Sequence, residues 1–247
     1  MKEYEKMKSE TIGTVEQVFY TVCWVAFFSI IIPMVAVFIF FITGLGSLVL
    51  NNVSTFEQFE SNPNVTFIVL LISLLLIIPL LKYSLYSSER TLIIARLAVQ
   101  PVRICPLVYV LIVTFAYMIV EYYLADHLMV EAPNFMLEMQ GQTNNLLDKS
   151  LLFFAVVVIA PIFEEVIFRG VAFYRLQQTA LGVSGAVVIP SLIFAFLHGQ
   201  YDQVNIFVLL FLFSCFMGGV RSLTGNIWYC VLGHMIINLF AISELIL

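Results

Sequence analysis

Charged residues are scarce in this sequence. Only 11% of its 247 residues are Asp, Glu, Lys or Arg, whereas 62% are hydrophobic and the mean hydropathy is +1.02. A soluble domain has about 25% charged and roughly 45–50% apolar residues. The composition therefore excludes an ordinary soluble fold and indicates a polytopic membrane protein. The net charge of −5 gives no reason to expect nucleic acid as a partner.

Paired cysteines and short alternating strands are missing as well. The four cysteines fall in or beside apolar segments, without a CxxC spacing, at positions 23, 105, 215 and 230. Such cysteines are typically small buried hydrophobes rather than disulfide partners or metal ligands. Segments of alternating polarity, which build membrane β-barrels, do not occur. The predicted fold is consequently all-α, a polytopic bundle of transmembrane helices.

Apolar segments predict about seven spans, since a helix needs roughly 20 apolar residues to cross ~30 Å of hydrocarbon. The spans are expected at residues 19–42, 66–81, 106–124, 151–168, 183–197, 206–219 and 227–247. Between them we expect polar loops at 51–65 and 125–150, a linker with a surface-lying helix at 82–103, and a basic stretch at 169–181. We predict a cytosolic arm over residues 1–17 and a single transmembrane domain over residues 18–247.

The lysines and arginines predict the orientation of this bundle. Cytosolic loops of membrane proteins carry an excess of Lys and Arg. If the N-terminus is cytosolic, ten of the 11 basic residues fall on the cytosolic side, and only Lys149 falls outside. We therefore expect an integral, multi-pass protein with its N-terminus in the cytosol.

One apolar segment, LLFFAVVVIAPIFEEVIFRG at residues 151–170, carries Glu164, Glu165 and Arg169. A charge at the bilayer centre costs at least about 3 kcal/mol, so ionisable groups there are usually kept for function. Adjacent residues on a helix point about 100° apart, and Glu165 lies one turn before Arg169 in the favourable order for an ion pair. We predict that Glu165 is the structural partner of Arg169 and that Glu164 faces a polar site.

Two later apolar segments carry further polar residues. His198 closes FAFLH, and His234 and Asn238 lie one turn apart in HMIIN. Taken singly, each fits an interfacial residue or a hydrogen bond between helices. Together with Glu164 they supply a general base, an orienting partner and hydrogen-bond donors. That set suits water-mediated acyl hydrolysis.

These three motifs carry a resemblance to a known family. EEVIFR, FAFLH and HMIIN resemble the EExxxR, FxxxH and HxxxN motifs of the CPBP family, the CAAX-protease and bacteriocin-processing intramembrane endopeptidases, also called Abi. The resemblance places a protease core at about residues 151–247, while residues 1–150 carry no motif. It implies that Glu164 and His198 activate a water and that His234 and Asn238 stabilise the oxyanion, with Glu165 and Arg169 supporting the site.

The resemblance leaves the cofactor and the substrate open. The family is described as one of metalloproteases. In that case Glu164, His198 and His234 would be ligands of a divalent metal such as zinc. The spacing differs from HExxH, and a metal-free glutamate base is equally compatible. The implied substrate is a membrane-associated peptide or small protein, prenylated or a precursor, and the implied location is a bacterial plasma membrane.

Two other classes of function remain as alternatives. A non-catalytic immunity or scaffold protein can share the fold. A proton-coupled transporter also uses intramembrane Glu and His, but it predicts mirrored repeats, and the sequence shows no internal repeat. The segment that His198 closes is only about 15 residues, or ~22 Å, long, which is too short to cross the bilayer completely. The sequence therefore does not determine how deep His198 lies relative to Glu164.

Overall fold

The computed structural model describes residues 13–46, 55–131, 133–199 and 203–246, and every regular element in these ranges is a helix. The all-α prediction is therefore confirmed. Within the described ranges, five helices are long and apolar enough to cross a membrane, and two shorter apolar helices accompany them. Each of the seven predicted spans lies on one of these helices.

The first three spans are separated by connections at residues 43–62 and 85–103. The first is a continuous helix made of α2 (Thr14–Ala26), a π-helical turn (Phe27–Ile31) and α3 (Ile32–Ile42). The second is α6 (Pro63–Ser84), and the third is α8 (Ile104–His127). The side chain of Asn62 begins α6 by accepting hydrogen bonds from two backbone amides, and Pro63 occupies the first turn, where its missing N–H does no harm.

The fourth span is the longest helix, Leu146–Leu176. It comprises α10 (Leu146–Phe153), the π-helical η2 (Phe154–Ile159), α11 (Ala160–Glu165), the π-helical η3 (Val166–Ala172) and α12 (Phe173–Leu176). The last three helices are α13 (Gly182–Leu197), α14 (Val204–Thr224) and α15 (Ile227–Ile246). Segments of π-helix inside α-helices are rare and occur frequently at functional sites.

Three short helices lie in the described parts of the connections. The segments predicted as polar loops include α5 (Phe56–Glu60) and α9 (Asn134–Gln142), and the linker contains α7 (Arg90–Arg96), where a surface-lying helix was predicted. Of the predicted N-terminal arm, residues 1–12 lie outside the described residues, and α2 begins at Thr14.

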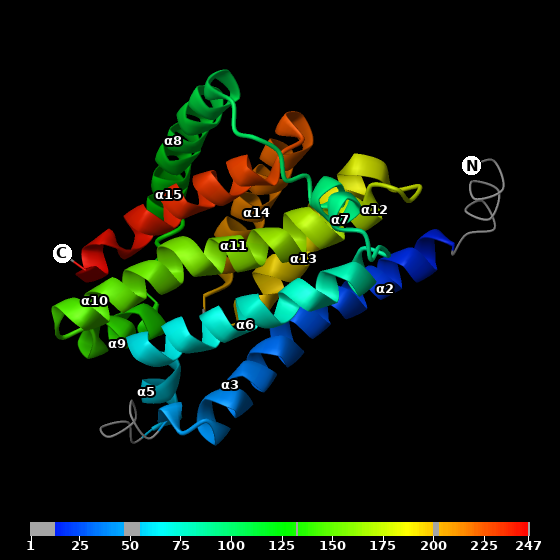
Figure 1. Cartoon of the computed structure of the whole chain (residues 1–247). Helices are drawn as coiled ribbons and strands as arrows, with labels where there is room; N and C mark the ends of the chain where they lie inside the picture. Colours follow the sequence, from blue (N-terminus) through cyan, green and yellow to red (C-terminus); the bar gives the residue numbers. More distant parts are fainter. Residues whose placement is uncertain (1–12, 47–54, 132, 200–202, 247) are drawn as a thin grey trace, which may run out of the picture.

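The fourth span lies at the centre of the bundle, between α6 on one side and α15 on the other (Figure 1). Its η2 segment packs against both of these helices, while η3 and α12 pack against α2 and α13. More of this helix is buried than of any other span. The residues of the EEVIFR motif are therefore held inside the protein rather than in lipid.

We predicted a basic stretch outside the membrane at residues 169–181, and this prediction is wrong for the first half of the stretch. The helix continues to Leu176, and both Arg169 and Arg175 are buried inside the protein. Arg175 donates hydrogen bonds to the Ser84 carbonyl, at the C-terminal end of α6, and to Thr21 Oγ1 of α2. Free carbonyls at a helix C-terminus carry partial negative charge, so they stabilise a buried guanidinium.

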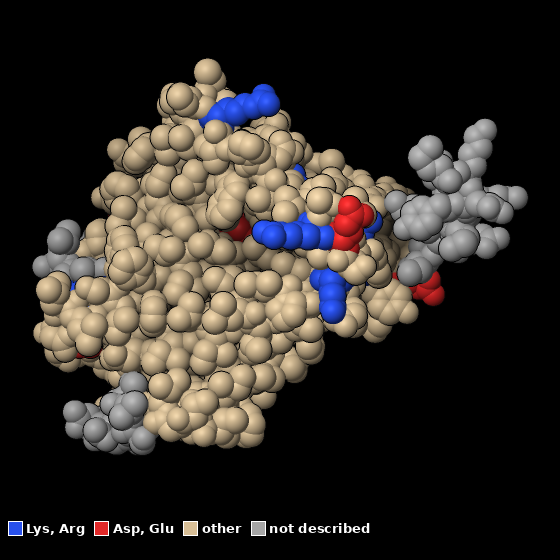
Figure 2. Space-filling view, viewed as in Figure 1, with Lys and Arg blue, Asp and Glu red and all other residues tan. Residues whose placement is uncertain are grey.

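Most of the surface seen in Figure 2 is uncharged, and its charged side chains gather toward the end of the molecule where α7 and α12 lie. The exposed residues of α2, α3, α6 and α8 are largely aromatic and aliphatic, as expected for helices that face lipid. The protein is thus an integral, multi-pass helical bundle.

Candidate active site

The two glutamates of α11 have different surroundings. Glu165 is fully buried, whereas the side chain of Glu164 is 22% exposed. Glu165 Oε1 lies 3.1 Å from Arg169 Nη1, one turn later in η3. Because the pair is adjacent on a helix, the two carboxylates diverge, and only Glu165 is tied to the guanidinium.

Arg169 is held from the other side by α14. Its Nη2 donates to both the backbone carbonyl and the hydroxyl of Ser214, each at 2.8 Å. Its guanidinium also lies 5.5 Å from the centre of the Phe194 ring. Sequence reasoning missed Ser214, because a single serine in an apolar segment has no spacing that marks it. The only available signal was a small polar residue inside a span, which commonly forms a contact between helices.

His234 of α15 lies between the two glutamates. Its Nδ1 is 2.8 Å from Glu165 Oε1, and its Nε2 is 3.7 Å from Glu164 Oε2. An ionised carboxylate has no hydrogen to donate, so the N–H is on Nδ1, which donates a hydrogen bond to Glu165. The ring of Phe213 packs 4.7 Å away, edge to face. The sequence predicted Glu165 as a partner of Arg169, and the structure adds His234 to that pair.

His198 lies at the end of α13 and contacts Phe194, the residue that begins the FAFLH motif. Its Nδ1 is 2.7 Å from the Phe194 carbonyl, and the two rings are 4.3 Å apart. A carbonyl is an acceptor, which places the proton on Nδ1 and makes Nε2 the acceptor nitrogen. The Phe194 ring also lies 6.4 Å from that of His234. The structure therefore brings both imidazoles against one phenylalanine.

Asn238 connects α15 with the helix that carries the glutamates. Its Nδ2 donates a 2.8 Å hydrogen bond to the carbonyl of Val156 in η2. The side chain is half-buried, and it lies one turn after His234 on the same face of α15. Together, His234 and Asn238 link α15 to the fourth span at two levels.

The arrangement does not offer a ready ligand set for a metal ion. In the described part of the chain, no three His, Cys, Asp or Glu side chains are grouped as metal ligands. One nitrogen of His234 contacts Glu165, and one nitrogen of His198 contacts a backbone carbonyl. Zinc would need three or four ligands within about 2.0–2.3 Å. The side chains as placed do not fit that geometry.

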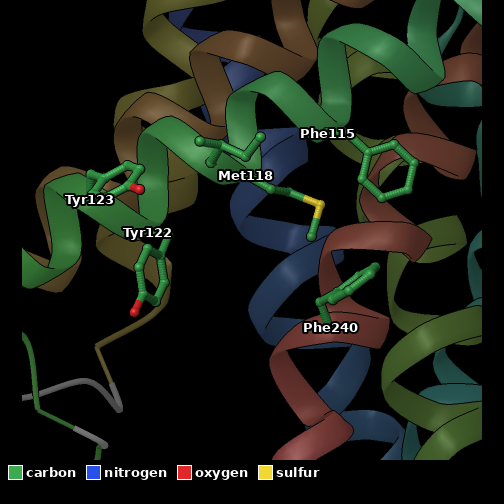
Figure 3. A pocket seen from close by; sticks show the side chains of 6 residues that line it. Phe115, Met118, Tyr122, Tyr123 and Phe240 are labelled. Carbon is green, nitrogen blue, oxygen red and sulfur yellow. The ribbon is translucent and has the colours of Figure 1, made fainter.

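A groove opens between α8 and α15, close to the end of α15 (Figure 3). Its volume is about 310 Å³, and its lining is apolar and aromatic: Phe115, Met118, Ile119, Tyr122, Tyr123 and Phe240. None of the predicted site residues lines it. The groove is therefore separate from the cluster of Glu164, Glu165 and His234.

Comparison with protein families gives a match in the second half of the chain. Residues 146–240 match the family described as type II CAAX prenyl endopeptidase Rce1-like. No curated protein and no solved structure matches the chain. The matched residues contain all three motifs, from EEVIFR in the fourth span to HMIIN in α15. The match over residues 146–240 is thus to the Rce1-like type II CAAX prenyl endopeptidases, consistent with the resemblance to the CPBP and CAAX-protease family.

Proposed function

We propose that this protein is an intramembrane endopeptidase of the CAAX-protease type, acting on peptide bonds of membrane-associated peptides. One observation carries the proposal: two apolar helices meet inside the bundle and place the imidazole of His234 between Glu164 and Glu165. Ionisable groups gathered within the membrane are usually functional. The family of residues 146–240 supports a protease.

In the proposed reaction, Glu164 is the general base. It is the more exposed of the two glutamates, and it is not paired with Arg169. Glu164 takes a proton from a water that His198 Nε2 also positions, and the water oxygen attacks the scissile carbonyl carbon. The C–N bond then breaks, and the proton held by Glu164 passes to the leaving amine.

His234 and Asn238 are proposed to stabilise the oxyanion. The Asn238 amide has two N–H groups, and one of them is used by Val156. His234 can donate from Nε2 only when both nitrogens carry protons. The Glu165 carboxylate beside Nδ1 stabilises that imidazolium, as a buried Asp does in serine proteases. Removing one oxyanion donor typically raises the barrier by about 3–4 kcal/mol.

The substrate class follows from the location of the site. The catalytic groups lie on apolar helices, so a peptide anchored in the bilayer reaches them more readily than a soluble one. A prenylated C-terminus or a short precursor peptide meets this requirement. We propose a bacterial plasma membrane as the location.

The test is cleavage of a membrane-anchored peptide by the purified protein in lipid nanodiscs. We expect Glu164→Gln to abolish hydrolysis. Glu121→Gln is the matched control, because Glu121 is a carboxylate in another span, where it is hydrogen-bonded to Tyr117, and it should keep activity. Full activity of Glu164→Gln would refute the proposal. Adding zinc or a chelator to the same assay distinguishes a metal-dependent from a metal-free reaction.

A further inference from the structure

The π-helical turn before the glutamates leaves one backbone carbonyl without a donor in its own helix. In η2 the hydrogen bonds join residues five apart: the N–H of Ala160 donates to the Ala155 carbonyl. The same spacing assigns the Val156 carbonyl to the nitrogen of residue 161. That residue is Pro161, which has no N–H. A carbonyl left unsatisfied in an apolar bundle is strongly unfavourable.

Asn238 supplies the missing donor from another helix. Its Nδ2 lies 2.8 Å from the Val156 oxygen, across 82 residues of sequence. One turn earlier on α15, His234 contacts Glu165 at 2.8 Å. α15 therefore holds the fourth span both before and at the glutamates. These two polar contacts lie one turn apart on α15 and join it to the fourth span at two levels.

We propose that Asn238 is a positioning residue that replaces the N–H absent at Pro161, and so keeps His234 opposite the glutamates. The inference rests on the proposed function for its catalytic consequence only. The bond of Asn238 to Val156 aligns α15, and it leaves the second N–H of the amide for the oxyanion of the proposed reaction. Pro161 and Asn238 act as a pair, although no sequence spacing links them.

The test is a double-mutant cycle in the full-length protein. Asn238→Leu keeps the volume of the side chain and removes the donor, so we expect a lower unfolding temperature and a lower kcat. Pro161→Ala restores an N–H at residue 161. We therefore expect Pro161→Ala with Asn238→Leu to unfold at the temperature of Pro161→Ala alone. Additive losses in the double variant would overturn the proposal.

Asn205 provides the matched control. Its Nδ2 donates at 2.7 Å to the Leu128 carbonyl, which has no relation to Pro161. The loss in unfolding temperature caused by Asn205→Leu should remain when Pro161→Ala is added. Equal rescue of Asn205→Leu and Asn238→Leu would show a general effect of Pro161→Ala and would overturn the proposal.

Nuclear magnetic resonance of the isotope-labelled protein gives a readout that does not depend on turnover or on Asn238→Leu folding. In Pro161→Ala, the new amide competes with Asn238 for the Val156 carbonyl. We expect the side-chain amide resonance of Asn238 to shift and that of Asn205 to stay. An unchanged Asn238 resonance would overturn the inference, whereas absence of hydrolysis by every form of the protein would count against the proposed function alone.

Discussion

At the scale of single residues, Ser214 shows how a small polar side chain supports a buried charge. Its carbonyl and its hydroxyl both accept from Arg169, which in turn holds Glu165. Glu165 then orients His234 through Nδ1. Ser214 thus acts on the site through two intermediaries and touches no reacting atom.

Ser214→Ala should lower both stability and kcat. A hydrogen bond to a charged group contributes about 1.5–3 kcal/mol, and the backbone carbonyl retains one of the two bonds to Arg169. We expect a loss of unfolding free energy near the lower end of this range, together with a severalfold drop in kcat at unchanged KM. Ser191→Ala is the control, since that buried hydroxyl donates to the Val187 carbonyl of its own helix. Equal effects of the two substitutions would argue against this role.

At the scale of elements, the packing of α13 against α14 depends on one of two adjacent glycines. A Cβ added at Gly218 would lie 2.9 Å from Val187 Cγ1, whereas one added at Gly219 would meet no atom within 4 Å. Val187 is β-branched and has little freedom to rotate on a helix. α13 ends at Leu197, directly before His198, and α14 carries Ser214, so the separation of the two helices affects the site.

Gly218→Ala should therefore be destabilising, by about 1–3 kcal/mol as in other overpacked interiors. The neighbouring Gly219→Ala should be neutral or stabilising by up to ~1 kcal/mol, because alanine favours the helix. The comparison is made by thermal unfolding in one detergent. Combining Val187→Ala with Gly218→Ala should restore stability, and failure of this rescue would contradict the steric explanation.

At the scale of the whole molecule, the charges predict how the bundle sits in the membrane. Lys and Arg are expected on the cytosolic side, near α7, and α9, which carries Glu138, on the opposite side. Glu89 and Glu138 are exposed representatives of the two regions.

This orientation is tested in a form of the protein without its four native cysteines. A membrane-impermeant thiol reagent should modify Glu138→Cys in intact cells and Glu89→Cys only after lysis. The reverse pattern would place the N-terminus outside. Both positions lie on the surface of the protein, so the reagent can reach either cysteine once it is on the same side of the membrane.

The sequence by itself determined the helical architecture and the contacts within one helix. Backbone groups in lipid must be satisfied inside each segment, so long apolar segments form helices wherever they pack. The pairing of Glu165 with Arg169 is likewise local, since residues four apart share a face.

Only the tertiary structure decided which distant residues meet these groups. His234 lies 69 residues from Glu165, Ser214 lies 45 residues from Arg169, and Asn238 reaches Val156 across 82. The burial of Arg175 depends in the same way on the end of α6, 91 residues away in sequence. Spacing along a helix specifies a face but not the helix opposite it. The partners depend on how the helices cross, and packing across the whole bundle determines that.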